Sequence, residues 1–135
     1  MITPEQKQQL IAAACTAREN AYVPYSNYPV GAALLMADGA IVTGVNVENA
    51  SYGLTICAER AAVFHAVAQG EKGFQAIGLC VPGAGAPCGA CRQVLHEFAP
   101  AIKLFIADEK DETIHELELA DLLPRAFGPG DLQGP

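Results

Sequence analysis

Basic residues are few in this sequence, and they are scattered singly along it. Eight Lys and Arg stand against fifteen Asp and Glu, which gives a formal net charge of −7. Binding a nucleic-acid backbone takes clustered Lys and Arg. The composition therefore disfavours a polynucleotide substrate or a nucleic-acid partner and suits a small neutral molecule.

Long apolar runs are also missing. The stretch 30–37 falls well short of the roughly 20 residues of a membrane helix, and residues 1–5 lack the basic start and apolar stretch of a secretory signal. We therefore expect a cytoplasmic protein with no membrane partner. The 135 residues contain no internal repeat or linker, so we expect one domain over 1–135. The order of the tail after about residue 128 is left open.

A disulfide framework is not indicated either, because the number of cysteines is odd and their spacing is uneven. The cytoplasm keeps thiols reduced, so metal binding or burial is the expected role of these residues. Cys15 and Cys80 fall on predicted apolar faces and are expected in the core. The other three are Cys57, Cys88 and Cys91.

Apolar periodicity and turn signals predict alternating helices and strands. Asp38-Gly39 indicates a hairpin, and helical crossovers between the later strands favour parallel pairing there. We therefore expect an α/β domain with three α-β-α layers and a mixed sheet. The acidic run 108–118 is expected to be a solvated loop and a helix start. The predicted elements are helices over 3–22, 57–69, 88–98 and 117–123 and strands over 30–36, 41–47, 76–81 and 102–107.

Two short motifs place cysteines at predicted helix starts: Cys-Ala-Glu-Arg at 57–60 and Pro-Cys-Gly-Ala-Cys-Arg at 87–92. A helix N-terminus lowers the pKa of a thiol towards the metal-binding thiolate. Cys88 and Cys91 are three residues apart, so both sulfurs can reach one ion. Together with Cys57 they would leave zinc one ligand short of tetrahedral, as in catalytic sites that keep a place for water.

Glu59 lies two residues beyond Cys57 and therefore points elsewhere, where it can take a proton from that water without binding the metal. Three thiolates leave the site negative overall, and Arg60, in preference to Arg92, is expected to donate to the sulfurs. Three other interpretations stay open. The cysteines could be buried thiols, Cys88 and Cys91 a redox pair, or the site a structural zinc closed by Cys80 or His96.

The two motifs together are similar to the signature of zinc deaminases, with Cys in place of the first His. The likeness extends over roughly residues 5–128 and resembles the small homotetrameric cytidine deaminases. The segments that carry it are Val-Pro-Tyr-Ser at 23–26, Val-Gly-Ala-Ala at 30–33, Asn-Val-Glu-Asn-Ala-Ser-Tyr at 46–52, the two cysteine motifs with Gln93, and Leu-Leu-Pro at 122–124.

This resemblance implies a five-stranded sheet, one Zn²⁺ per chain and a homotetramer with shared active sites. The implied reaction is the hydrolysis of cytidine and deoxycytidine to uridine and deoxyuridine, with release of ammonia, in pyrimidine salvage. A deaminase of another aminopyrimidine, such as an aminonucleoside antibiotic, is the alternative, although the segment 46–49 fits a plain ribose better.

The resemblance also implies roles for individual residues. Zinc would be held by Cys57, Cys88 and Cys91, and Glu59 would be catalytic. The implied substrate contacts are Asn46 and Glu48 on the ribose hydroxyls, Ala58 and Glu59 on the cytosine edge, Tyr28 at the base pocket where the family usually has Phe, and Ala50, Tyr52 and Phe127 in a neighbouring subunit's site.

Overall fold

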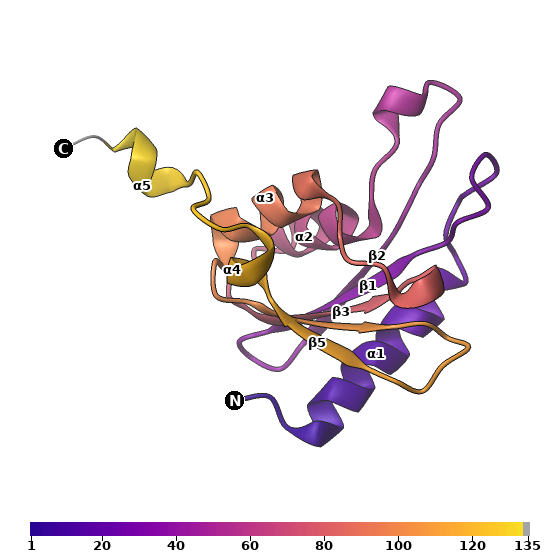
Figure 1. Cartoon of the computed structure of the whole chain (residues 1–135), viewed down its shortest axis with the longest axis horizontal. Helices are drawn as coiled ribbons and strands as arrows, with labels where there is room; N and C mark the ends of the chain where they lie inside the picture. Colours follow the sequence, from indigo (N-terminus) through magenta and orange to yellow (C-terminus); the bar gives the residue numbers. More distant parts are fainter. Residues whose placement is uncertain (134–135) are drawn as a thin grey trace.

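The computed structural model describes residues 1–133 and shows one mixed sheet of five strands in the order β2-β1-β3-β4-β5 (Figure 1). Only β3 and β4 are parallel, and the other neighbours are antiparallel. The strands are β1 (Gly31–Met36), β2 (Ile41–Val45), β3 (Phe74–Cys80), β4 (Lys103–Ala107) and β5 (His115–Glu118). The helices are α1 (Pro4–Arg18), α2 (Ala58–Ala68), α3 (Gly89–Phe98), α4 (Leu119–Leu122) and α5 (Pro129–Leu132), with 3₁₀ turns η1 (Tyr52–Leu54) and η2 (Pro82–Ala84).

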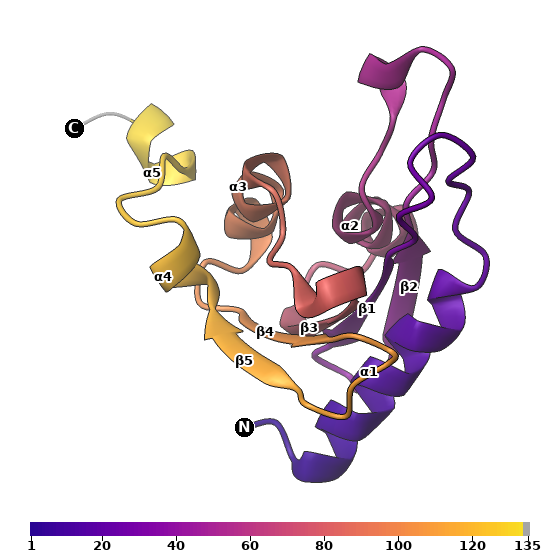
Figure 2. The same ribbon diagram turned by 45° about the vertical axis from the view of Figure 1, so that its right-hand side comes forward.

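Helices cover both faces of the sheet. Figure 2 shows α1 below the sheet and α2 and α3 above it. Successive side chains of a strand point to opposite faces, so Ala33 and Leu35 of β1 join the core under α1, while Ala32 and Leu34 join the core under α2 and α3. The expected three-layer architecture with a mixed five-stranded sheet is confirmed.

Close packing of α2 on the sheet depends on a glycine in β2. A Cβ atom on Gly44 would overlap the backbone nitrogen of Ala62. Because glycine has no Cβ, the helix can lie directly against the strand. The N-terminus of α2, which carries the expected site residues Ala58, Glu59 and Arg60, is thereby held close to the sheet.

Two of the sequence-based element boundaries are wrong. The first helix, expected to reach residue 22, ends at Arg18 because Tyr22 instead forms a bridge with Val47, its N–H donating to Asn46 O at 3.0 Å. The helix expected over 117–123 is also wrong in its first part. Residues 115–118 form β5, which pairs antiparallel with β4, and only 119–122 are helical.

Other expectations agree with the structure. Thr3 caps α1 with a full capping box, and Cys80 is buried, although Cys15 is only partly so. The tail contains α5, and residues 134 and 135 lie outside the described residues. Within 1–133, no helix combines the length and apolar character that crossing a membrane requires.

Candidate active site

Three cysteines converge where α2 and α3 begin. Cys57 is the N-cap of α2, Cys88 is the N-cap of α3, and Cys91 lies in the first turn of α3. Neither N-cap cysteine uses its side chain to cap its helix, so the sulfurs are free to face one another. Cys88 Sγ lies 3.8 Å from Cys57 Sγ and 3.6 Å from Cys91 Sγ.

These separations fit a tetrahedral zinc ion. Zinc–sulfur bonds of about 2.3 Å in that geometry place neighbouring sulfurs about 3.8 Å apart. Among the described residues, no fourth Cys, His, Asp or Glu offers a ligand atom to this cluster. The donor set therefore suits zinc with one open position, and it does not support the alternative of a site closed by Cys80 or His96.

The two arginines that follow the cysteine motifs have different partners. Arg60 Nη2 donates to Cys57 Sγ at 3.3 Å, and its buried Nε has no partner among the described residues. Arg92 contacts backbone instead, donating from Nε to Pro87 O at 2.7 Å and from Nη1 to Leu122 O at 2.9 Å. Arg60 is thus placed to withdraw charge from the sulfurs, whereas Arg92 anchors the loop that ends at Cys88.

The thiols influence one another electrostatically. A hydrogen bond from Cys91, and then the hydrogen bond from Arg60, lower the pKa of Cys57 to about 5. The same bond to Cys57, together with burial, raises the pKa of Cys91. One thiolate is therefore already favoured at neutral pH, and a bound cation would favour the others because a metal ion stabilises coordinated thiolates.

Glu59 is the buried acid of the site, with only 6% of its surface exposed. Burial is the main reason that the pKa of its carboxyl is raised, and the neighbouring Cys57 adds to this effect. A raised pKa brings a carboxyl closer to neutral pH, where it can both accept and return protons. Glu59 is not one of the metal-site residues, since that group comprises the cysteines alone.

The acid and two of the cysteines line a cavity of about 230 Å³. This volume is below the roughly 300–1,000 Å³ of typical small-molecule pockets. Of the residues expected to contact substrate, Tyr28, Asn46 and Ala58 line the same cavity. Sequence reasoning missed Thr55, Ile56 and the wall at 85–87, although the Gly/Pro run before Cys88 could have pointed to that wall.

Other expected substrate contacts lie elsewhere. Glu48 and Tyr52 line a neighbouring cavity of about 270 Å³, which shares Thr55 with the first. Ala50 and Phe127 line neither cavity. Figure 1 shows that the loop carrying η1 and the segment carrying α5 extend away from the sheet on different sides of the molecule.

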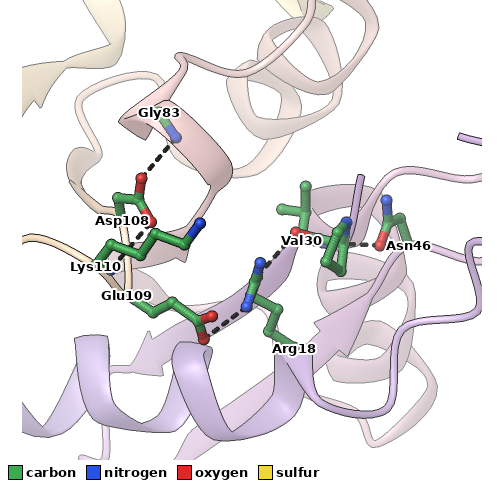
Figure 3. A network of polar contacts seen from close by, with 8 residues as sticks. Arg18, Val30, Asn46, Gly83, Asp108, Glu109 and Lys110 are labelled. Atoms are coloured by element: carbon green, nitrogen blue, oxygen red, sulfur yellow. Dashed lines mark hydrogen bonds and ion pairs between the residues drawn. The ribbon is translucent and has the colours of Figure 1, made fainter. Parts of the chain in front are cut away.

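Asn46 and Glu48 both bind backbone groups of the segment before β1. Asn46 Oδ1 accepts from Val30 N at 2.9 Å, as Figure 3 shows, and its Nδ2 donates to Tyr28 O at 2.7 Å. Glu48 accepts from the backbone N–H groups of Tyr25 and Ser26 and from the Ser26 hydroxyl. That hydroxyl is the main reason that the pKa of Glu48 is lowered. Both side chains therefore shape the loop that borders the two cavities.

The α/β fold brings three thiols and a buried carboxyl together at the N-termini of two helices. This combination defines a protein of the zinc-dependent hydrolase type. Residues 4–107 match the family model described as the cytidine and deoxycytidylate deaminase zinc-binding region. The chain belongs to the cytidine and deoxycytidylate deaminase family.

Individual relatives agree with this assignment. The chain is 48% identical to a cytidine deaminase of Halalkalibacterium halodurans, over 93% of this chain and 97% of the relative. It is also 48% identical to one of Mycobacterium tuberculosis, over 88% of this chain and 87% of the relative. Among solved structures, cytidine deaminase from Burkholderia pseudomallei superposes with a TM-score of 0.85 at 48% identity, covering 89% of this chain and 98% of that one.

Proposed function

We propose that this protein is a zinc-dependent deaminase that hydrolyses cytidine and deoxycytidine to uridine and deoxyuridine and releases ammonia. One observation carries the proposal. Glu59, Cys57 and Cys88 line the same cavity, and three cysteine ligands would leave a tetrahedral zinc ion with one free position. A proton carrier and an activated water can therefore meet the same small molecule.

Zinc held by Cys57, Cys88 and Cys91 would lower the pKa of a water at the open position from about 16 towards 7. Glu59 takes one proton from the attacking water and delivers it to N3 of the base. It then carries the remaining hydroxyl proton to the amino group on C4, which leaves as ammonia. The water oxygen becomes O4 of uridine, so atoms and charge balance.

The remaining polar capacity near the cavity suits a nucleoside. Asn46 keeps one amide N–H and Glu48 keeps about one free lone-pair site, and we assign both to the ribose hydroxyls. The backbone of Ala58 and the carboxyl of Glu59 would read the cytosine edge. The ring of Tyr28 would lie against the base, because it lines the cavity beside these groups.

We further propose a homotetramer in which Ala50, Tyr52 and Phe127 complete a neighbouring subunit's site. Tyr52 is 73% exposed and Phe127 is 59% exposed, and both belong to the extended segments of Figure 1. Exposed aromatic side chains are typical of interface cores. The small volume of the cavity in a single chain supports the same assembly.

Residues 1–135 would then act as one cytidine deaminase domain, because a single five-stranded sheet with helices on both faces carries the three cysteines and Glu59. We also assign the protein to the cytoplasm. The cysteine ligands are unpaired in the structure, and they must remain reduced to bind zinc. The cytoplasm maintains thiols in that state.

The test is an ultraviolet assay of cytidine, deoxycytidine and cytosine with wild-type protein and Glu59→Gln. Removing the proton carrier should lower kcat about 100- to 10,000-fold, the range of general acid–base catalysis, while zinc stays at about one ion per chain because the substitution leaves the three thiols in place. Glu97→Gln, on the exposed side of α3, is the matched control and should behave as wild type. Equal activity of wild type and Glu59→Gln would end the assignment.

A further inference from the structure

One wall of the active-site cavity is a loop with an unusual backbone. The loop joins β3 to α3, and Val81, Gly85 and Pro87 of this loop line the cavity. Within it, η2 contains two consecutive left-handed residues, Gly83 with φ 71° and Ala84 with φ 53°. Left-handed backbone is disfavoured for a residue that has a Cβ. The turn therefore needs surrounding contacts to hold it.

Asp108 supplies one of these contacts from the adjacent strand. Because β3 and β4 are parallel and Cys80 pairs with Ala107, the residues that follow both strands meet at the same edge of the sheet. Asp108 Oδ2 accepts from Gly83 N at 2.9 Å, as Figure 3 shows, and Oδ1 accepts from Lys110 N at 3.1 Å. The Gly83 and Lys110 N–H groups lower the pKa of Asp108, which keeps it charged at neutral pH.

Tyr28 supplies the second contact from within the cavity. Its hydroxyl donates to Pro82 O at 3.0 Å, so a side chain that lines the cavity also holds the turn. A Cβ atom on Gly85 would lie 3.4 Å from the same hydroxyl oxygen, so the wall passes close to Tyr28. The turn is thus held at Gly83 by the carboxylate of Asp108 and at Pro82 by the phenol of Tyr28.

The other end of the loop is anchored independently. Arg92 Nε donates to Pro87 O at 2.7 Å, and Arg92 N donates to Cys88 O at 3.1 Å. These contacts keep Cys88 at the start of α3 whether or not the turn at 83–84 is held. Release of the turn would consequently displace the wall at 85–86 more than it would displace the metal ligand.

We propose that Asp108 is a positioning residue of this deaminase, whose carboxylate holds the Gly83-Ala84 turn and so sets the shape of the wall that meets the nucleoside. This inference rests on the proposed function. Asp108 acts through the loop backbone alone and lines neither of the two cavities at the site. Its effect should therefore appear in nucleoside affinity, while proton transfer by Glu59, which is carried by α2, continues.

Asp111 offers a matched control on the same loop. Asp111 is exposed and Asp108 half-buried, and the Oδ1 of Asp111 likewise accepts from the backbone N–H two residues on, that of Thr113, at 2.9 Å. Asp111→Ala removes the same charge and the same kind of hydrogen bond as Asp108→Ala. It leaves the turn at 83–84 untouched, so the two variants differ in the contact that the proposal concerns.

The experiment uses the full zinc-loaded chain and measures KM and kcat for cytidine, zinc content, and the dissociation constant of uridine by titration calorimetry. For Asp108→Ala we expect both KM and the uridine dissociation constant to rise about three- to tenfold, as for loss of one hydrogen bond. We expect kcat to stay within about twofold and zinc content to be unchanged, because Arg92 still anchors Cys88. Asp108→Asn keeps an acceptor oxygen and should restore most of the affinity, and Asp111→Ala should match wild type.

Tyr28→Phe is a second variant that removes the hydroxyl contact to Pro82 O, and it should shift the same two constants in the same direction. Unchanged uridine affinity in Asp108→Ala would overturn the inference whatever the effect of Tyr28→Phe, because Tyr28 also lines the cavity itself. A fall in the kcat of Asp108→Ala that follows a loss of zinc would also overturn the inference, because Asp108 would then act on the metal site. Failure of the proposed function would look different, because wild type and Asp111→Ala would then also leave cytidine unconverted.

Discussion

The two ends of the active site are built in different ways. The chemical end consists of Glu59 and three cysteines, and Glu59 and Cys91 are buried at the starts of α2 and α3. The other end lies around the neighbouring cavity and consists of Tyr25, Glu48 and Tyr52, which loops carry; the two tyrosines are exposed and Glu48 is half-buried. Helices packed on a sheet position the first set, whereas hydrogen bonds between loops position the second.

This contrast shows which part of the function one chain can supply alone. Glu59 and Cys91 are buried within the chain, so we expect the metal and the proton carrier to need no partner. The loop end leaves aromatic side chains in solvent. The rings of Tyr25 and Tyr52 lie tilted against each other, with their centroids 5.7 Å apart. Enclosure of the substrate is therefore the part that we assign to assembly.

The largest effect is expected at the chemical end. Cys91→Ala removes the buried sulfur from the cluster, and the two that remain cannot define a tetrahedral zinc site. Zinc content should fall well below one per chain, and cytidine turnover should fall at least about ten-thousandfold because the water loses its activation. Metal analysis beside the ultraviolet assay checks this. Cys80→Ala, which removes a buried thiol outside the cluster, should retain zinc, and equal zinc loss in both variants would contradict the assignment.

A smaller effect is expected at the loop end. Tyr52→Ala should weaken assembly and raise KM for cytidine about tenfold or more, as for an aromatic residue at an interface centre, while zinc stays bound. Sedimentation velocity and steady-state kinetics measure the two effects. Ile41→Ala, at an exposed position of the β1–β2 hairpin, is the control. A fully active monomer, whether of the wild type or of a variant, would show that the loop end needs no neighbouring subunit for activity.

The smallest effect concerns the stability of the metal-free protein. Burial raises the pKa of Glu59 above its usual 4.5, so the folded state binds its proton more tightly than the unfolded state does. The resulting stability is fully present below pH 4.5 and is lost as the pH rises through the folded pKa. Glu59→Gln lacks this carboxyl, so its stability shows no such loss. The lowered pKa of Cys57 stabilises the folded state as the pH rises, but most of this contribution is common to both proteins and cancels in the comparison. The melting temperature of Glu59→Gln minus that of wild type should therefore increase by a few degrees between pH 4 and pH 7.

A constant difference in melting temperature across that pH range would contradict the idea that the carboxyl is destabilised by burial. Both proteins must be stripped of metal with a chelator first, because a bound cation changes the charge that Glu59 experiences.

Much of the fold followed from local patterns. The capping box at Thr3, the Asp38-Gly39 hairpin and the helix starts after Cys57 and Cys88 each depend on residues within a few positions of one another, and the structure contains all of them. The strand β5 could not be found in this way. Its residues His-Glu-Leu-Glu lack apolar alternation, and they form a strand because they pair with β4 and because Lys103 lies near Glu116 and Glu118.

The amino-acid sequence by itself determined the zinc-site cysteines, the acid beside them and the helix starts that carry them, because the spacing of these residues along the chain already encodes their chemistry. Only the tertiary structure decided that Arg92 reaches the backbone of Leu122, that Glu48 holds the Tyr25-Ser26 backbone, and that Asp108 holds Gly83. These contacts join residues far apart in the chain. Asp108 and Gly83, for example, become neighbours only because the parallel strands β3 and β4 bring the loops that follow them to one edge of the sheet.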